Sequence, residues 1–126
     1  MLYVNEILGA SFCLFSLVLG AFTSHYLKKI IPDSAIRSFE VGVRYLMYHG
    51  LVLMILPQFY LDINPLVFKF FVLGTCIFSF SIFLLSIKSL IKINLNWLGP
   101  LTPVGGGILI IAWIFLLFEL IDPFLN

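Results

Sequence analysis

Four apolar runs dominate this chain, each near the roughly 20 residues that a helix needs to cross a hydrocarbon layer of about 30 Å. The chain is 62% hydrophobic and 10% charged, whereas a typical soluble domain is about half apolar and about a quarter charged. The runs are continuous rather than alternating, which argues against a membrane β-barrel. The sequence therefore predicts an all-α membrane protein, a single domain in which four transmembrane helices joined by short loops form a bundle.

Prolines and turn residues predict where these helices begin and end. The expected spans are residues 7–26, 34–60, 65–87 and 103–121. Glu6 is the only charged side chain before the first run, so a mature helix is favoured over a signal peptide, which needs a basic leader. Asp33 or Ser34 is expected to cap the second helix, and Pro57 to kink or end it. Thr102 is expected to cap the fourth helix.

The basic side chains gather near one set of helix ends. Those on this side are Lys28, Lys29, Arg37, Lys88 and Lys92, with Arg44 just below them, while Lys69 lies near the other side. The positive-inside rule then predicts cytoplasmic loops at residues 27–33 and 88–96 and both termini outside, in a bacterial inner membrane. A net charge of +1 without a basic block argues against nucleic acid as a partner. The expected partners are the lipid bilayer and another membrane protein or a second copy.

Small residues predict where the helices pack closely. They form a stripe on the first helix and cluster at the start of the fourth, and on the third helix Ser79 shares one face with Thr75 and Ser86. The predicted packing residues are Gly9, Ser16, Gly20, Ser79, Thr102, Gly105 and Gly106. The stretch GPLTPVGGG also offers free amides at a helix start, which attract anions. It lacks the lysine and Ser/Thr of a phosphate loop, so close packing is the preferred interpretation.

The second helix carries most of the polar groups that enter an apolar span. On a helical wheel one stripe holds Arg37, Glu40, Arg44 and Tyr48, and a second holds Ser38, Gly42, Tyr45 and His49. Both stripes are expected to face the other helices. The opposite face is expected to contact lipid; it holds Phe39, Val43, Leu46, Met47, Leu53 and Met54. The candidate polar or ligand cluster is His25, Glu40, Arg44, Tyr45, Tyr48 and His49.

Spacing predicts contacts within this cluster. Glu40 and Arg44 are four residues apart, which suits an ion pair on one helix face, and His25 is expected near Glu40. His49 lies about 13 Å further along the helix axis than Glu40, toward the middle of the bilayer. Two interpretations stay open, a fixed polar contact that sets helix packing and a functional polar site. No metal or cofactor is expected, because no third ligand accompanies the two histidines.

Four stretches resemble one known family. They are GAFTSHYLKK (20–29), SFEVGVRYLMYH (38–49), FSFSIFLL (78–85) and WLGPLTPVGGG (97–107). They are similar to signature stretches of the YgdD-like family, domain of unknown function 423, which comprises small bacterial inner-membrane proteins and a mitochondrial relative in animals. Departures from the family pattern occur at Thr23, Ser24, Leu46 and Phe80, and Phe80 in place of glycine argues against a close helix contact there. The resemblance implies a four-helix integral membrane protein and supplies no reaction.

Two functional hypotheses of different class follow. Short loops, tight seams and the lack of a nucleophile paired with a base favour a non-enzymatic accessory subunit or scaffold, in which the polar cluster fixes packing or docks a partner. The alternative is a site that handles protons or a small solute and opens to the cytoplasm through the same cluster. An enzyme acting on lipid is less favoured, because neither a metal motif nor a catalytic triad is present.

Overall fold

The chain folds into four long helices that run alternately up and down. A computed structural model describes residues 3–59 and 62–125, with side chains described as far as residue 122. In these residues the helices are α1 (Val4–His25), α2 (Asp33–Ile55), α3 (Pro65–Ser86) and α4 (Leu101–Leu125). All four are long and apolar enough to cross a membrane. The predicted four-helix membrane bundle is confirmed.

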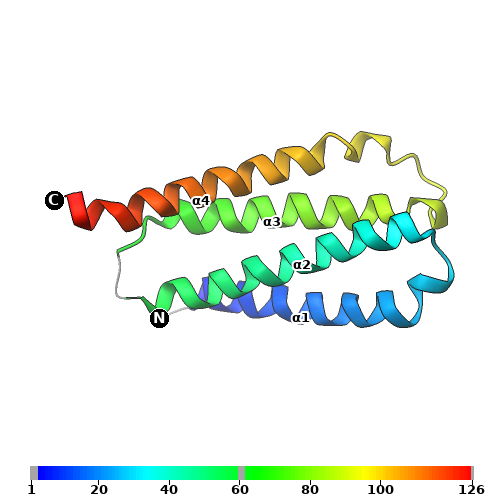
Figure 1. Cartoon of the computed structure of the whole chain (residues 1–126), viewed down its shortest axis with the longest axis horizontal. Helices are drawn as coiled ribbons and strands as arrows, with labels where there is room; N and C mark the ends of the chain where they lie inside the picture. Colours follow the sequence, from blue (N-terminus) through cyan, green and yellow to red (C-terminus); the bar gives the residue numbers. More distant parts are fainter. Residues whose placement is uncertain (1–2, 60–61, 126) are drawn as a thin grey trace.

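The bundle consists of two helical hairpins that meet through their inner helices. α1 packs against α2, α4 packs against α3, and α2 and α3 join the two hairpins. α1 and α4 therefore lie on opposite sides of the central pair, and the two ends of the chain lie at the same end of the bundle (Figure 1). The loops between α1 and α2 and between α3 and α4 lie at the other end, which we call the loop end.

The helix ends follow from prolines and one side-chain cap. Asn64 Oδ1 accepts the Leu66 N–H at 2.9 Å, and Pro65 occupies the first position of α3. α2 ends at Ile55 and continues only as a short 3-10 segment over Leu56–Gln58, because proline cannot donate the next helical hydrogen bond. The predicted end of this span at residue 60 lies outside the described residues.

Two predicted caps were wrong. α2 already includes Asp33 and Ser34, and its N-cap is Pro32, whose φ of −62° and ψ of 154° bring the chain extended into the first turn. α4 begins at Leu101, so Thr102 lies within the helix rather than before it. At α2, the fixed φ of Pro32 starts the helix earlier than a hydroxyl cap would.

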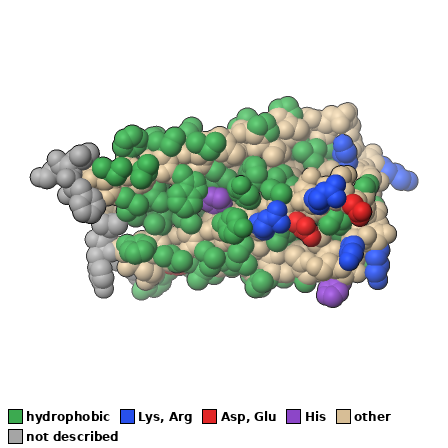
Figure 2. Space-filling model, in the orientation of Figure 1, with side chains coloured by type: hydrophobic (Ala, Val, Ile, Leu, Met, Phe, Trp, Pro, Cys, Tyr) green, Lys and Arg blue, Asp and Glu red, His purple; other side chains and the backbone are tan. Residues whose placement is uncertain are grey.

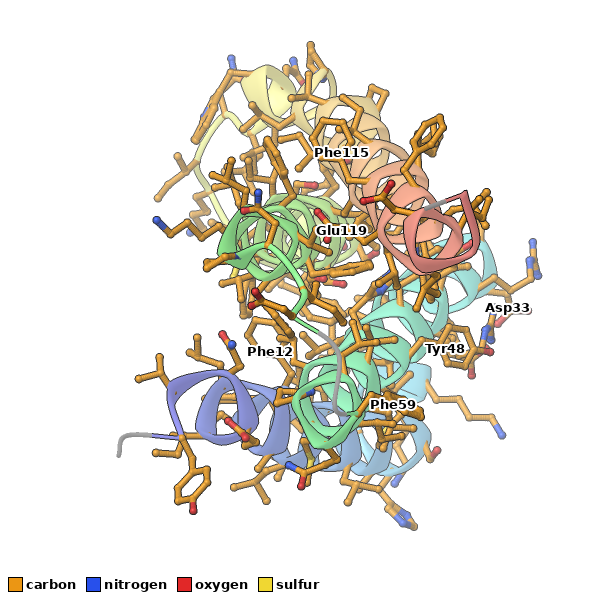
Figure 3. All side chains as sticks on the ribbon, turned by 90° about the vertical axis from the view of Figure 1, so that its left-hand side faces the viewer. Phe12, Asp33, Tyr48, Phe59, Phe115 and Glu119 are labelled. Atoms are coloured by element: carbon orange, nitrogen blue, oxygen red, sulfur yellow. The ribbon has the colours of Figure 1, made fainter. Side chains whose placement is uncertain are left out.

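Aromatic and branched side chains fill the interior between the two hairpins. Figure 3 looks along the bundle and shows Phe12 pointing from α1 toward this interior. Leu46 and Leu53 of α2 and Phe71 of α3 are fully buried. The outer surfaces of α1 and α4 stay apolar and exposed, as expected for helices that contact lipid.

Candidate functional site

One of the two predicted polar stripes lies on the outside of the bundle. Arg37, Glu40 and Arg44 are exposed, and Tyr48 is 52% exposed on the outer side of α2 (Figure 3). On the face shown in Figure 2, the Lys, Arg, Asp and Glu side chains gather toward the loop end, and hydrophobic side chains cover much of the rest of the described surface. Among the described residues no ion pair joins Glu40 to Arg44, although their spacing permits one. We call Arg37, Glu40, Arg44 and Tyr48 the outer polar row.

The prediction that the apolar face of α2 contacts lipid was wrong. Phe39 is 3% exposed, and Leu46 and Leu53 are completely buried against the other helices. A membrane bundle gains little from hiding leucine, because lipid tails are as apolar as leucine itself. The helical wheel therefore identifies which residues share a face, but hydrophobicity does not decide which face turns inward.

Close backbone approach decides the orientation of α2. Gly50 and Gly9 meet where α2 crosses α1, so that a Cβ atom added to Gly9 would lie 2.5 Å from the Gly50 carbonyl oxygen. On the other side, a Cβ added to Gly42 would lie 2.6 Å from the ring of Phe83 of α3. An added Cβ would meet backbone at Gly9 and Gly50 and a buried aromatic ring at Gly42, which explains why the face of α2 that carries Gly42 and Gly50 turns inward.

Hydroxyl groups join the neighbouring helices to the backbone of α2. Ser16 Oγ of α1 donates to the Val43 carbonyl at 2.8 Å, and Ser79 Oγ of α3 donates to the Gly42 carbonyl at 3.0 Å. Both contacts use carbonyl oxygens that already accept a helical hydrogen bond, since a carbonyl has two lone pairs. α2 is thus held from both sides at the same level of the bundle.

The other predicted packing residues also lie between helices. Gly20 faces the Val43 side chain across 3.6 Å, measured to a Cβ added at Gly20. Gly105 allows α4 to approach the backbone of α3, since an added Cβ would lie 2.8 Å from Phe78 Cα, and Gly106 borders the Phe78 ring. Thr102 Oγ1 lies 2.7 Å from Ser81 Oγ, which is the polar contact between the start of α4 and α3.

His49 is the buried member of the predicted cluster, at 3% exposure. Its Nδ1 lies 2.7 Å from the Tyr45 carbonyl oxygen, and its Nε2 accepts the Trp113 Nε1–H at 3.2 Å. Because an indole nitrogen can only donate, Nε2 must carry the lone pair and Nδ1 the hydrogen. This pattern assigns the neutral Nδ1–H tautomer, in which each ring nitrogen has one partner.

This arrangement favours a structural role for His49. Neither nitrogen has a lone pair free for a metal or a haem, and a proton added at Nε2 would face the Trp113 N–H donor. Three elements surround the ring: Tyr45 precedes it by one turn, Phe71 of α3 lies 5.8 Å away between ring centroids, and Trp113 of α4 lies 6.1 Å away. His49 therefore links α2 to α4 inside an aromatic cluster, which includes an edge-on Phe71–Trp113 contact at 5.1 Å.

Sequence reasoning missed Trp113 as the partner of His49. The only available signal was an indole near the middle of the last apolar run, where its single N–H donor needs an acceptor. The polar stripes of α2 do not indicate how close α4 lies to them, since α4 begins more than 40 residues after α2 ends. Folding alone brings the two side chains together.

Of the remaining candidates only Tyr45 contacts His49, through its carbonyl oxygen and its ring. His25 is exposed at the end of α1, Tyr45 is 40% exposed, and Glu40 lies on the outer polar row. Within the described residues, no group of three or more His, Cys, Asp or Glu side chains is placed to hold a metal ion. Cys13 and Cys76 are free thiols, half-buried on α1 and α3. Among the predicted cluster residues, Tyr45 thus lies between the exposed Tyr48 and the buried His49, while His25, Glu40 and Arg44 make no described contact with His49.

Comparison with known proteins places the chain among membrane proteins. Residues 19–106 match the family described as protein of unknown function, DUF423. The UPF0382 membrane protein YwdK of Bacillus subtilis is 36% identical, and the alignment covers 86% of this chain and 88% of the relative. The UPF0382 membrane protein SH2409 of Staphylococcus haemolyticus is 35% identical, with coverages of 90% and 91%.

A eukaryotic protein is also similar. The UPF0382 membrane protein C1782.12c of Schizosaccharomyces pombe is 33% identical, and the alignment covers 79% of this chain and 86% of the relative. No solved structure matches the chain.

Proposed function

The chain belongs to the DUF423 family of membrane proteins, and on that premise we propose that it is a non-enzymatic accessory subunit or scaffold that docks another membrane protein. The contact surface is the outer polar row of α2 together with the neighbouring surface of α1. The loop end faces the cytoplasm of a bacterial inner membrane, by the positive-inside rule. The single observation that carries this proposal is the exposed position of Arg44.

Arg44 lies deep enough for its charge to matter. It follows Asp33, the first residue of α2, by about 16 Å along the axis at 1.5 Å per residue, whereas half of a hydrocarbon core is about 15 Å. An unpaired arginine at the bilayer centre costs about 2.5–3.5 kcal/mol on insertion scales. The side chains of a helix lean toward its N-terminus, so the guanidinium of the free protein can reach toward the loop end and water.

In this proposal, a groove beside Arg44 receives side chains of a transmembrane helix of the partner. It has a volume of about 360 Å³ and lies between α1 and α2. Ser16, Gly20 and Ala21 form its small-residue wall, and Arg44 and Tyr48 form its polar edge. Small residues allow a helix of a partner to approach closely, and the partner would supply a carboxylate or carbonyl acceptor to Arg44. The expected partner is therefore another membrane protein with a polar acceptor at this depth.

Photocrosslinking in intact membranes tests this contact. A photoreactive amino acid at Leu17, which lines the groove and is 64% exposed, should give one discrete protein adduct. The matched control is Ile110 of α4, which is 63% exposed on an unrelated face and should react only with lipid. Arg44→Ala should abolish the adduct at Leu17, since the partner loses its polar anchor.

Two results would overturn the proposal. An adduct between two copies of this chain would identify a homodimer instead of an accessory subunit. Equal labelling of lipid at the two positions, without a protein adduct, would show that the α1–α2 surface faces only the bilayer.

A further inference from the structure

A second groove lies at the loop end, where α2 and α4 begin and α3 ends. It has a volume of about 530 Å³, within the range of small-molecule sites. Ser34 and Ala35 line it from the first turn of α2, Ser86 from the last turn of α3, and Thr102 from the first turn of α4. Three segments that are distant in the sequence thus build one site.

The polar end of this groove carries one positively charged side chain. Among its described lining residues, Lys88 carries the only formal charge, and no carboxylate is present. The starts of α2 and α4 both border the groove, and each helix start carries about half of a positive elementary charge. The nearby GPLTPVGGG stretch lacks a lysine of its own, and the fold supplies Lys88 from the preceding loop.

Free donors accompany this charge. The first backbone bond of α2 runs from the Ile36 N–H to the Pro32 carbonyl, and no side chain caps the helix. The amides of Ser34 and Ala35 therefore precede the helical hydrogen bonds and stay available for a ligand.

Ser86 is the observation that points to a ligand. The residue is 6% exposed and lines the groove, yet its hydroxyl oxygen has no hydrogen-bond partner. A buried hydroxyl without a partner destabilises the folded state, so an acceptor in the groove would remove a penalty that the bundle otherwise carries.

The Thr102 hydroxyl donates to Ser81 and therefore has no proton left for a ligand. Ser81 Oγ donates to the Phe78 carbonyl at 3.0 Å, so the proton shared between Ser81 and Thr102 must come from Thr102. The donors left for a ligand are Ser86, Ser34, Lys88 and the α2 amides, which is a set that suits an anion with several acceptor oxygens.

The deeper wall of the groove is apolar. Val41, Ile82 and Leu85 line it, and Val41 lies about 12 Å further along α2 than Asp33 at 1.5 Å per residue. We propose that the groove binds an anionic phospholipid, with its phosphate between Lys88, Ser86 and the start of α2, and its acyl chain along this wall. A polar end at the membrane surface and an apolar wall below it match the two parts of such a lipid.

Native mass spectrometry of the detergent-purified protein tests the proposal. The probes are dioleoyl phosphatidylglycerol and dioleoyl phosphatidylcholine, which have the same acyl chains and differ in head-group charge. The wild-type protein should retain one phosphatidylglycerol about tenfold more strongly than phosphatidylcholine, and Lys88→Ala should remove this preference. Lys92→Ala is the matched control: it removes an exposed lysine of the same loop that does not line the groove, and it should change binding less than about twofold.

Ser86→Ala separates ligand binding from folding. It should weaken phosphatidylglycerol binding several-fold while leaving the melting temperature of the lipid-free protein unchanged or higher, because the lost hydroxyl has no partner in the bundle. Equal binding of the two lipids to wild type, or equal losses in Lys88→Ala and Lys92→Ala, would overturn the proposal. Complete displacement of the lipid by millimolar inorganic phosphate would also overturn it, since the site would then be one for a soluble anion.

Discussion

Trp113→Phe should destabilise the bundle through the hydrogen bond that it removes. Trp113 Nε1–H donates to His49 Nε2 at 3.2 Å, and His49 is 3% exposed, so little water can reach the abandoned acceptor. A buried acceptor without a donor costs about 1–3 kcal/mol in soluble proteins. Hydrogen bonds between membrane helices are weaker, averaging about 0.6 and reaching about 1.7 kcal/mol. We therefore expect the bond itself to contribute about 0.6–1.7 kcal/mol.

A double-mutant cycle isolates this contribution. Trp113→Phe also shortens the ring that packs against Phe71, and His49→Phe changes the same aromatic cluster. The single variants and the double variant are compared by their free energies of unfolding in mixed micelles titrated with dodecyl sulfate. The double variant should lose about 0.6–1.7 kcal/mol less than the sum of the two single losses, because the hydrogen bond can be lost only once.

The control is Trp97→Phe, which removes an indole that is 64% exposed and makes no described hydrogen bond. Its free energy of unfolding should stay within about 0.5 kcal/mol of wild type. Additive losses, within about 0.3 kcal/mol, would refute the His49–Trp113 bond as a stabilising link between α2 and α4.

Three further substitutions test the packing in the same unfolding assay. Gly105→Ala should lower the free energy of unfolding by about 1–3 kcal/mol, because the new methyl group would meet backbone atoms of Phe78. Gly107→Ala is the control and should be neutral or more stable, because a Cβ added there meets no atom within 4 Å. Equal losses in the two variants would contradict the α3–α4 contact. Ser79→Ala should lower the free energy of unfolding by about 1 kcal/mol, because it removes the hydrogen bond to the Gly42 carbonyl. Ser89→Ala, at an exposed position, is the control and should not lower it. Thr75→Val should be neutral or stabilising, because the buried Thr75 hydroxyl has no partner; a clear loss would reveal one.

Much of the architecture was predictable because crossing a bilayer limits the choices. Long apolar runs must become helices in lipid, where each backbone group needs an internal partner, and prolines such as Pro57 and Pro65 end or start them. The end positions were less predictable, since the N-cap of α2 is Pro32, one or two residues before the expected cap at Asp33 or Ser34. The expected small residues Gly9 and Gly105 lie between helices, because close backbone approach is the main way that membrane helices associate.

The candidate site was less predictable than the fold. The spacing of Glu40, Arg44 and His49 correctly placed them on neighbouring stripes of α2. It did not determine whether both stripes face the interior, as expected. His49 turned inward with Gly42 and Gly50, while Glu40 and Arg44 turned outward. A rotation of α2 by about one residue, 100°, separates these outcomes, and only the shapes of the neighbouring helices choose between them.

The sequence by itself determined four transmembrane helices, their order and the residues that share each face, because helix length and the 3.6-residue period are local properties. Only the tertiary structure decided which face of α2 is inside, joined His49 to Trp113, and brought Lys88 and Ser86 to the starts of α2 and α4. The reason is physical: lipid and protein interior are equally apolar, so hydrophobicity cannot orient a helix. Close glycine contacts and hydroxyl hydrogen bonds to the two neighbouring helices, between residues 27 or more positions apart in the chain, orient it instead.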